Sequence, residues 1–365
     1  MPDLNRCLAL VTDAFDGKGG IAQYNRDFLT ALAECGVVSS VDVLPRHRSE
    51  TSDLPTGLRQ LPHRGGRIGY AAVALYYAQA AGVRVIFCGH LYMAALAAVI
   101  ARLTNAKLIV QLHGIEAWCR PSRLRRYAVE TADLVLCVSR FTRAAVLGWA
   151  AIEPERVVVL PNTVAECFTP GDGRVLRAEL GFDDHKRVLL TVGRLDIREQ
   201  YKGHDRVIAA LPQLIAQGHD VVYVVIGEGE DRARLEALAA DAGMAGHVKF
   251  LGAVELPRLI EAYRMANLFV MPSTGEGFGI AFLEAMACGT PAVGLKVAGA
   301  IDALADGELG ILTSEAEFPA AVAAALSRPK GDRRLLANAV RARFGREAFA
   351  AKLRAAVRPQ LTASS

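Results

Sequence analysis

Glycines and glutamates gather in one segment, Ser273–Pro291, which reads STGEGFGIAFLEAMACGTP. The segment follows an apolar, strand-like run and leads into a helical pattern. Glycine lets the backbone approach a ligand closely, and the free N–H groups at a helix N-terminus bind anions. Glu276 in the loop and Glu284 in the helix could accept hydrogen bonds from sugar hydroxyls on either side of a phosphate. The pattern therefore predicts a sugar-phosphate site that includes three glycines: Gly275, Gly277 and Gly279.

Other candidate catalytic or binding residues follow strand-like runs elsewhere in the sequence. Arg194 and Lys202 come after the run Val188–Val192 and could stabilise negative charge. Gly19 and Gly20 separate the first expected strand from the first expected helix, where doubly wound domains bind phosphate. His113 ends the run KLIVQLHG, and Glu116 lies close behind it. A histidine at a strand end is either a hydrogen-bonded structural residue or part of a site.

Two series of apolar strands alternating with helical patterns must position these residues. Continuous apolar strands separated by amphipathic helices are typical of parallel sheets covered on both faces. In such sheets ligands bind at the carboxyl ends of the strands. The first series has strands at Leu8–Val11, Val83–Phe87, Leu108–Leu112, Leu134–Val138 and Val157–Leu160. The second has strands at Val188–Val192, Val221–Ile226, Val248–Leu251, Leu268–Met271, Pro291–Leu295 and Ile311–Leu312.

The length of 365 residues also favours two domains, because one hydrophobic core rarely grows to this size. The Pro- and Gly-containing stretch Asn162–Asp184 is the expected seam. We predict an N-terminal Rossmann-like acceptor domain over 1–165 and a C-terminal Rossmann-like donor domain over 166–345. A C-terminal helix and tail over 346–365 could pack back on the first domain.

The longest match to a known family is the run Phe250–Gly294, FLGAVELPRLIEAYRMANLFVMPSTGEGFGIAFLEAMACGTPAVG. It resembles the E-x7-E motif region of family 4, the retaining glycosyltransferases of the GT-B fold. The resemblance extends to TVGRLDIREQYKGHDRVIAAL at Thr191–Leu211 and to KGGIAQYNRDFLTAL near the N-terminus. It implies an α/β protein with two doubly wound Rossmann-like domains facing across a cleft. It also implies a retaining hexosyltransferase that uses a nucleotide diphosphate sugar, a UDP- or GDP-sugar, as donor.

The resemblance assigns roles to particular residues. Arg194 and Lys202 would contact the donor diphosphate in place of a metal, although Arg198 in the same loop is another cation. Glu276 would bind sugar hydroxyls, Glu284 the ribose, and the backbone at Val254 would lie near the base. His113 would face the reacting carbon. The remaining nucleotide-sugar contacts would come from Gly19, Gly20, Gly277, Phe278, Gly279 and Ile280. No acidic metal-binding pair follows a strand, so we expect no metal and no other cofactor.

The net charge and the cysteine content limit the classes of binding partner and the cellular compartment that the sequence supports. The net charge of +4 is too small to indicate a nucleic-acid binder. Residues 1–165 carry 18 basic and 13 acidic side chains, whereas the remainder carries 24 and 25. The cluster Arg120, Arg123, Arg125 and Arg126 is either a solvated face or a surface for phospholipid head groups or a diphosphate-linked acceptor. Seven cysteines without a CxxC pair, and a polar N-terminus without signal-peptide features, favour the cytoplasm.

We therefore predict a metal-independent transferase acting on a saccharide or lipid-linked acceptor, in polysaccharide or glycolipid biosynthesis. It would be cytoplasmic, with peripheral contact at the inner membrane face as a further expectation. A nucleotide-sugar epimerase of the same fold and a non-catalytic sugar-nucleotide-binding protein remain alternatives. A dinucleotide-dependent dehydrogenase is disfavoured because GxGxxG follows neither first strand.

Overall fold

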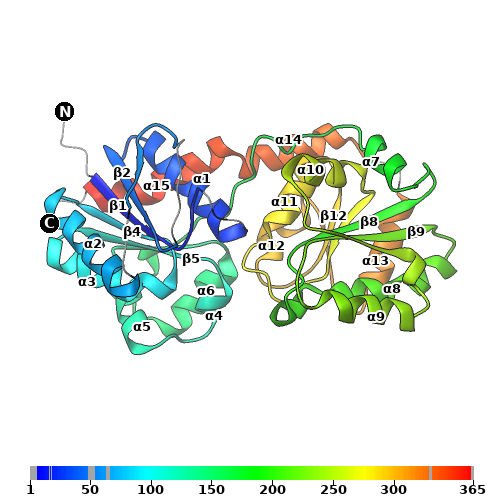
Figure 1. Ribbon diagram of the computed structural model, residues 1–365, viewed down its shortest axis with the longest axis horizontal. Helices are drawn as coiled ribbons and strands as arrows, with labels where there is room; N and C mark the ends of the chain where they lie inside the picture. The colour runs from blue at the N-terminus through cyan, green and yellow to red at the C-terminus, as the bar shows by residue number, and fades with distance from the viewer. Residues whose placement is uncertain are drawn as a thin grey trace. The chain divides into compact units, whose positions relative to one another are not determined.

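The computed structural model describes residues 6–15, 17, 19–47, 54–62, 66–328 and 331–362. Lys18 of the N-terminal motif and the last three residues of the predicted tail lie outside these ranges. The chain forms two compact units: unit 1 comprises residues 1–163 and 346–365, and unit 2 comprises residues 164–345. Each unit is a parallel β-sheet with helices on both faces (Figure 1). The predicted α/β fold with two doubly wound Rossmann-like domains is confirmed.

The sheet of unit 1 has the strand order β3-β2-β1-β4-β5-β6-β7, and every pair is parallel. The order reverses between β1 and β4, so the crevice of this sheet lies at the carboxyl ends of those two strands. The strands are β1 (Arg6–Val11), β2 (Ser40–Pro45), β3 (Leu58–Gln60), β4 (Val85–Cys88), β5 (Lys107–Leu112), β6 (Leu134–Cys137) and β7 (Val157–Val159).

Two strands of unit 1, β2 and β3, are additions to the five that the apolar runs predicted. Asp42 interrupts the apolar pattern of β2, where it is buried and accepts a hydrogen bond from Arg59 Nε at 2.7 Å. Strand β3 is three residues long and lies at the sheet edge, so it carries no apolar run. A short edge strand, and a buried aspartate that pairs with an exposed arginine, both weaken the apolar pattern on which sequence analysis depends.

The helices of unit 1 include one from the very end of the chain. Helix α15, red in Figure 1, packs against α1, and the ring of Phe349 meets the edge of Tyr24 at 6.1 Å. The helical segments are α1 (Gly20–Glu34), α2 (Gly66–Ala80), η1 (Leu91–Met93), α3 (Ala94–Thr104), α4 (Ile115–Trp118), α5 (Arg123–Glu130), α6 (Arg140–Trp149), η2 (Pro154–Arg156) and α15 (Arg346–Thr362).

The sheet of unit 2 has the strand order β10-β9-β8-β11-β12-β13, again with parallel pairs only. The order reverses between β8 and β11. All six strand runs predicted for this half fall on these strands, because most of them are short, buried apolar stretches. The run Val248–Leu251 is interrupted by the exposed Lys249, and Ile311–Leu312 is only partly buried. The strands are β8 (Arg187–Val192), β9 (Val221–Ile226), β10 (Val248–Gly252), β11 (Leu268–Met271), β12 (Ala292–Leu295) and β13 (Ile311–Thr313).

Helices cover both faces of the second sheet and bury its apolar side chains, with α8 and α13 on one face and α11 and α14 packed together. Within the described ranges of both units, no helix has the length and apolar composition needed to cross a bilayer. The helical segments of unit 2 are α7 (Arg174–Glu179), η3 (Ile197–Lys202), α8 (His204–Ala216), α9 (Arg232–Asp241), η4 (Ala245–His247), α10 (Leu256–Met265), α11 (Ile280–Ala287), α12 (Ala300–Ala303), η5 (Ala305–Gly307), α13 (Phe318–Ser327) and α14 (Arg333–Phe344).

Candidate functional site

The reversal of strand order in unit 2 brings two predicted segments together. The loop after β8 carries Arg194 and runs into η3, which ends at Lys202. The loop after β11 carries Glu276 and the glycines and runs into α11. Because β8 and β11 are neighbours with parallel direction, both loops leave the same edge of the sheet. This is the position at which open α/β sheets bind ligands.

Two cations and two carboxylates form a cluster between these loops. Lys202 Nζ lies 3.4 Å from Glu276 Oε1 and 3.7 Å from Glu199 Oε2. Arg194 also bonds Glu199 through its guanidinium. The side chains of Lys202, Glu199 and Glu276 are only 12–15% exposed, whereas that of Arg194 is 73% exposed. The Lys202 ammonium, which is shielded from water in this way, interacts strongly with an incoming anion because the local dielectric constant is low.

The third cation of the loop, Arg198, is directed elsewhere. Its guanidinium donates to both carboxylate oxygens of Asp196, at 3.1 and 2.9 Å, and its side chain is 85% exposed. Of the basic residues in this loop, Arg194 and Lys202 are therefore the two that share the carboxylate Glu199.

Glu199 itself was not predicted as a site residue. It sits in the same loop as the three basic residues, and its Oε2 atom is buried without a hydrogen-bond partner. An acidic residue inside an otherwise basic loop after a strand was the only signal in the sequence.

Two hydrogen bonds donated by backbone N–H groups hold the glycine loop. Gly275 N donates to Ser273 Oγ at 3.3 Å, and Gly299 N donates to the Glu276 carbonyl at 2.9 Å. Gly279 has a φ of 97° and ends the loop at the first turn of α11, where a side chain would also collide with the Phe282 ring. Gly279 has no side chain that could cap the first turn, in which Phe282 N donates to the Gly279 carbonyl at 3.1 Å. Backbone N–H groups at such a helix start can bind an anion.

The two loops also touch each other directly. Thr274 N donates to the Tyr201 carbonyl at 2.9 Å. Gly203, with a φ of 79°, lies so close to Pro272 that a Cβ atom there would be 2.4 Å from the Pro272 carbonyl oxygen. The loop that carries Lys202 can therefore approach the loop that carries Glu276 only because residue 203 is a glycine.

The remaining predicted residues of unit 2 lie on α11, in the glycine loop before it and in the loop after β10. Glu284, on α11, accepts a hydrogen bond from the Tyr263 hydroxyl at 2.7 Å. Phe278 is buried, with its ring against Phe344 at 5.7 Å, so it offers the site its backbone rather than its side chain. Val254 lies in the loop between β10 and α10. Tyr263 was missed by sequence analysis because a tyrosine in a helix gives no signal of a carboxylate partner.

The crevice of unit 1 gathers the other predicted residues. Gly19 and Gly20 lie at the start of α1, after β1, and Gly19 has a φ of 95°. His113 follows β5, and its Nε2 atom lies 2.8 Å from the Gly89 carbonyl at the end of β4. Glu116 accepts a hydrogen bond from the His113 backbone N–H at 2.6 Å, so it orients the loop rather than the imidazole.

A second histidine, His90, stands beside His113 and was not predicted. The two rings are 5.9 Å apart between centroids, and His90 Nδ1 accepts a hydrogen bond from Tyr92 N at 3.2 Å. Burial lowers the pKa of both histidines to about 4. Both are therefore neutral near pH 7, and His113 uses its Nε2–H to reach Gly89. The signal for His90 was present in the sequence, since it follows the strand-like VIFCG just as His113 follows KLIVQL.

We expect the neutral state of His113 to make folding stability depend on pH. The unfolded residue takes up a proton near pH 6.5, but the folded one does so only near pH 4, so stability is lost as pH falls between these values. The loss is at most about 1.4 kcal/mol per pH unit for one histidine. Urea unfolding at pH 7 and pH 5 should show a larger decrease in the wild type than in His113→Gln.

Comparing the wild type with His113→Gln cancels the pH dependence of stability that comes from the other titrating groups, which both proteins share. Burial raises the pKa of Asp27 in the same unit to about 6, which acts in the opposite direction. An equal pH dependence of the wild type and His113→Gln would show that the folded imidazole titrates normally.

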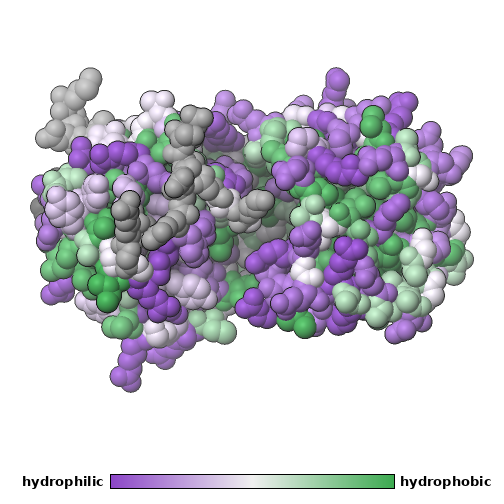
Figure 2. Space-filling view, in the orientation of Figure 1, coloured by the Kyte–Doolittle hydropathy of each residue, from purple (hydrophilic) through white to green (hydrophobic). Residues whose placement is uncertain are grey.

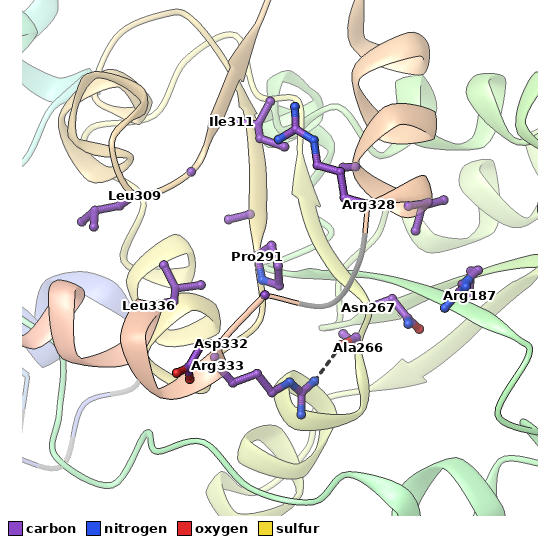
Figure 3. Close-up of a pocket in the computed structure, with 16 residues that line it drawn as sticks. Arg187, Ala266, Asn267, Pro291, Leu309, Ile311, Arg328, Asp332, Arg333 and Leu336 are labelled. Carbon is purple, nitrogen blue, oxygen red and sulfur yellow. Dashed lines mark hydrogen bonds between the residues drawn. The ribbon is translucent and has the colours of Figure 1, made fainter.

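A cavity of about 290 Å³ lies elsewhere in unit 2, at the opposite edge of the sheet (Figure 3). Its lining includes the residues that precede or begin β8, β11 and β12, namely Arg187, Asn267 and Pro291. Arg333 crosses it to donate to the Ala266 carbonyl at 3.3 Å. None of the predicted site residues lines this cavity. In the part of the chain that the structure describes, no three His, Cys, Asp or Glu side chains are grouped as metal ligands would be.

Two family models match consecutive parts of the chain. Residues 173–344 match the family model described as glycosyl transferases group 1, and residues 18–166 match that of glycosyltransferase family 4. D-inositol 3-phosphate glycosyltransferase of Geodermatophilus obscurus is 38% identical over 204 residues, 53% of this chain and 44% of that protein. A protein of the same name from Catenulispora acidiphila is 34% identical over 238 residues, 61% of this chain and 55% of that protein. The chain thus spans about half the length of these relatives.

Solved structures match over nearly the whole chain. HepE from Anabaena, in complex with UDP and glucose, has a TM-score of 0.78 at 19% identity, covering 97% of this chain and 99% of that one. Sucrose-phosphate synthase from Thermosynechococcus elongatus has a TM-score of 0.77 at 22% identity, covering 99% and 100%. At these identities the likeness establishes the fold. With the two family models matching consecutive parts of the sequence, the chain belongs to the group 1 glycosyltransferases of family 4, which have the GT-B fold.

Proposed function

We propose that this protein is a retaining glycosyltransferase that moves a hexose from a nucleotide diphosphate sugar to a hydroxyl group of a saccharide or lipid-linked acceptor. The observation that carries the proposal is the cluster of Arg194, Glu199, Lys202 and Glu276 at the β8/β11 reversal, beside the glycine loop that opens α11. Cations and a helix N-terminus suit the diphosphate, and carboxylates suit sugar hydroxyls. The comparison proteins include one whose structure holds UDP and glucose.

Unit 2 takes the donor in this proposal. The diphosphate binds Lys202 and Arg194 and the backbone N–H groups of Phe278, Gly279 and Ile280. Lys202 already lies between two carboxylates, so an incoming diphosphate exchanges part of those ion pairs for its own oxygens. Glu276 then turns to sugar hydroxyls and Glu284 to the ribose, while Val254 contacts the base through its backbone.

Unit 1 takes the acceptor, with His113 assigned to the reacting group and Gly19 and Gly20 to the diphosphate. We infer same-face displacement, in which the bond from the anomeric carbon to the diphosphate oxygen breaks as the bond to the acceptor oxygen forms. The acceptor proton passes to the departing phosphate oxygen. In this mechanism Glu276 orients the sugar through its hydroxyls, and no carboxylate is assigned as a nucleophile.

Incubation with donors tests the proposal against its two alternatives. A thermal-shift screen with UDP-, GDP- and ADP-sugars should identify a donor, because a ligand that binds only the folded state raises Tm. A transferase then releases the nucleotide diphosphate when an acceptor is added. Conversion of the donor sugar without any acceptor would indicate an epimerase. Binding without turnover over a broad set of acceptors would indicate a non-catalytic sugar-nucleotide binder.

We further propose that unit 1 docks on an anionic membrane through the surface of α3 and α5. Arg120 and Arg123 are exposed there, and the Arg125 guanidinium lies 4.7 Å from the centroid of the Tyr92 ring. Arg126 is paired with Glu130 at 3.1 Å. Five large apolar side chains of η1, α3 and α5 are each more than half exposed: Tyr92, Val99, Leu103, Leu124 and Tyr127. Figure 2 shows hydrophobic surface over α3 beside hydrophilic surface over α5.

Liposome co-sedimentation measures this docking. We expect tighter binding to anionic than to neutral vesicles, and weaker binding as salt rises, because exposed charges are screened. Each arginine near the surface contributes about 1 kcal/mol, so Arg120→Gln with Arg123→Gln should weaken binding roughly tenfold or more. Arg174→Gln, an exposed arginine of unit 2, is the matched control. Equal binding to both kinds of vesicle, or to neither, contradicts the proposal.

A further inference from the structure

Three polar side chains form a chain of hydrogen bonds inside the core of unit 2, beside the candidate donor site. They are His204 at the start of α8, Tyr223 on β9 and Thr191 on β8, and each is at most 5% exposed. His204 Nδ1 lies 2.9 Å from the Tyr223 hydroxyl, which lies 2.9 Å from Thr191 Oγ1. The Thr191 hydroxyl bonds the Val270 carbonyl of β11. Polar groups in an apolar core cost stability unless each finds a partner, so such a chain calls for an explanation.

The donor and acceptor in each of these hydrogen bonds follow from the last acceptor of the series, the Val270 carbonyl. The Val270 carbonyl can only accept, so the Thr191 hydroxyl donates to it and accepts from Tyr223. The Tyr223 hydroxyl has then used its proton and accepts from His204 Nδ1–H. His204 Nε2 therefore carries a lone pair, and it is buried without a hydrogen-bond partner. Burial lowers the His204 pKa to about 4, in keeping with a neutral ring. All bonds of the chain point from α8 towards β11.

This series of hydrogen bonds ends at the point where β8 and β11 separate. These strands have only two register pairs, Leu189 with Leu268 and Leu190 with Phe269. Thr191 and Val270 are the next residues along each strand, and there the side-chain hydroxyl of Thr191 joins the two. Beyond this point the strands continue into the two loops of the site. The Thr191–Val270 bond therefore sets the spacing at which those loops begin.

The other end of this series of hydrogen bonds, at His204, lies next to Lys202 in the sequence. His204 is two residues after Lys202, and only Gly203 separates them. The stem of Lys202 passes over Gly193, where an added Cβ atom would be 3.4 Å from Lys202 Cδ. Gly193 is in turn two residues after Thr191. Both the base of the Lys202 side chain and the backbone beneath it are thus attached to the same hydrogen-bonded chain.

We propose that His204, Tyr223 and Thr191 are positioning residues for the donor diphosphate. They hold the Lys202 loop and the ends of β8 and β11 at the spacing in which the lysine ammonium reaches the phosphate as charge develops. This inference rests on the proposed transferase function. None of the three touches the donor, so each acts through Lys202 and the β8 loop.

The test uses the full-length protein and removes one hydroxyl at a time. Thr191→Val breaks the bond to Val270, whereas Thr191→Ser keeps it. Tyr223→Phe removes the central hydroxyl with little change of shape, and it carries the test if Thr191→Val does not fold. Thr290→Val is the matched control, because the buried Thr290 hydroxyl also donates to a backbone carbonyl, that of Tyr263, at 2.6 Å.

We expect kcat to fall on the order of tenfold in Thr191→Val and Tyr223→Phe, because small displacements of a catalytic group have large effects on the chemical step. KM for the donor should change by less than about threefold, since Lys202 acts mainly in the transition state. Thr191→Ser should restore kcat, and Thr290→Val should lower Tm without lowering kcat.

A kcat for Thr191→Val and Tyr223→Phe equal to that of Thr290→Val overturns the inference and leaves the transferase function intact. Absence of transfer by the wild type, with every donor that binds, instead refutes the proposed function and this inference with it.

Discussion

Replacing Lys202 with methionine should lower turnover about a hundredfold or more, comparable to removing one transition-state donor in other enzymes. Negative charge accumulates on the departing phosphate as the bond to the sugar breaks, and a cation must be in place before that happens. Lys202 is 15% exposed at its side chain, so its charge acts in a medium that screens it weakly. Arg194→Met should have an effect of similar size, because the guanidinium can hold two phosphate oxygens at once.

Arg198→Met is the control for these variants. It removes a cation from the same loop, but one bound to Asp196 and 85% exposed, so turnover should stay near that of the wild type. Circular dichroism and Tm separate a loss of chemistry from a loss of folding, because Lys202→Met leaves Glu199 and Glu276 without their shared partner. An unchanged turnover in folded Lys202→Met excludes the lysine from the reaction.

The same assignment predicts a reaction that is independent of divalent metal, and turnover in excess EDTA measures this. We expect full activity, because in the proposed mechanism the two cations and the first turn of α11 neutralise the leaving group. Abolition by EDTA with recovery in magnesium or manganese would falsify the assignment, and Glu199 and Glu276 would then be reinterpreted as metal ligands.

The second large effect concerns the two glutamates of the E-x7-E segment. Glu276→Ala should lose turnover, on the order of a hundredfold, since it removes both a sugar contact and the carboxylate beside Lys202. Glu284→Ala should instead weaken nucleotide binding roughly tenfold, because a buried group that loses its partner costs about 1–3 kcal/mol. Steady-state kinetics with varied donor, together with nucleotide titration, distinguish the two.

Glu236→Ala provides the comparison, since it removes an exposed carboxylate of α9 that pairs only with Arg232 among the described residues. Wild-type kinetics in both Glu276→Ala and Glu284→Ala would remove the motif from the mechanism. Equal losses of turnover and binding in both would show that the loop and the helix act as one unit.

The sequence was sufficient to predict the strands of unit 2 and the loops that follow them. Most of those strands are short apolar runs, and the carboxyl ends of parallel strands meet at one edge. The pairing of Lys202 with Glu276, 74 residues away, follows from that rule and from the neighbouring positions of β8 and β11. The resemblance to the family suggested the roles of Lys202 and Glu276, and the strand order indicated that they lie close together.

Features that depend on tertiary contacts were not predictable in the same way. Glu199 and Arg198 are adjacent in the chain, yet one enters the cluster and the other turns to Asp196. That choice depends on the turn geometry of η3, where Glu199 departs from helical dihedral angles. Tyr223 reads as one more apolar strand residue, and only the structure reveals that its hydroxyl joins His204 to Thr191.

The return of α15 to unit 1 has a consequence for the order of events during synthesis. Unit 2 is continuous from residue 164 to residue 345, so all of it has been made before the last helix of unit 1 leaves the ribosome. Until then α1 lacks its neighbour, and the face that meets the buried side chains of Phe349, Leu353 and Val357 stays open to water. The first half to be translated is therefore the last to be completed, and a nascent chain halted at residue 345 would carry one finished half and one with an uncovered apolar face.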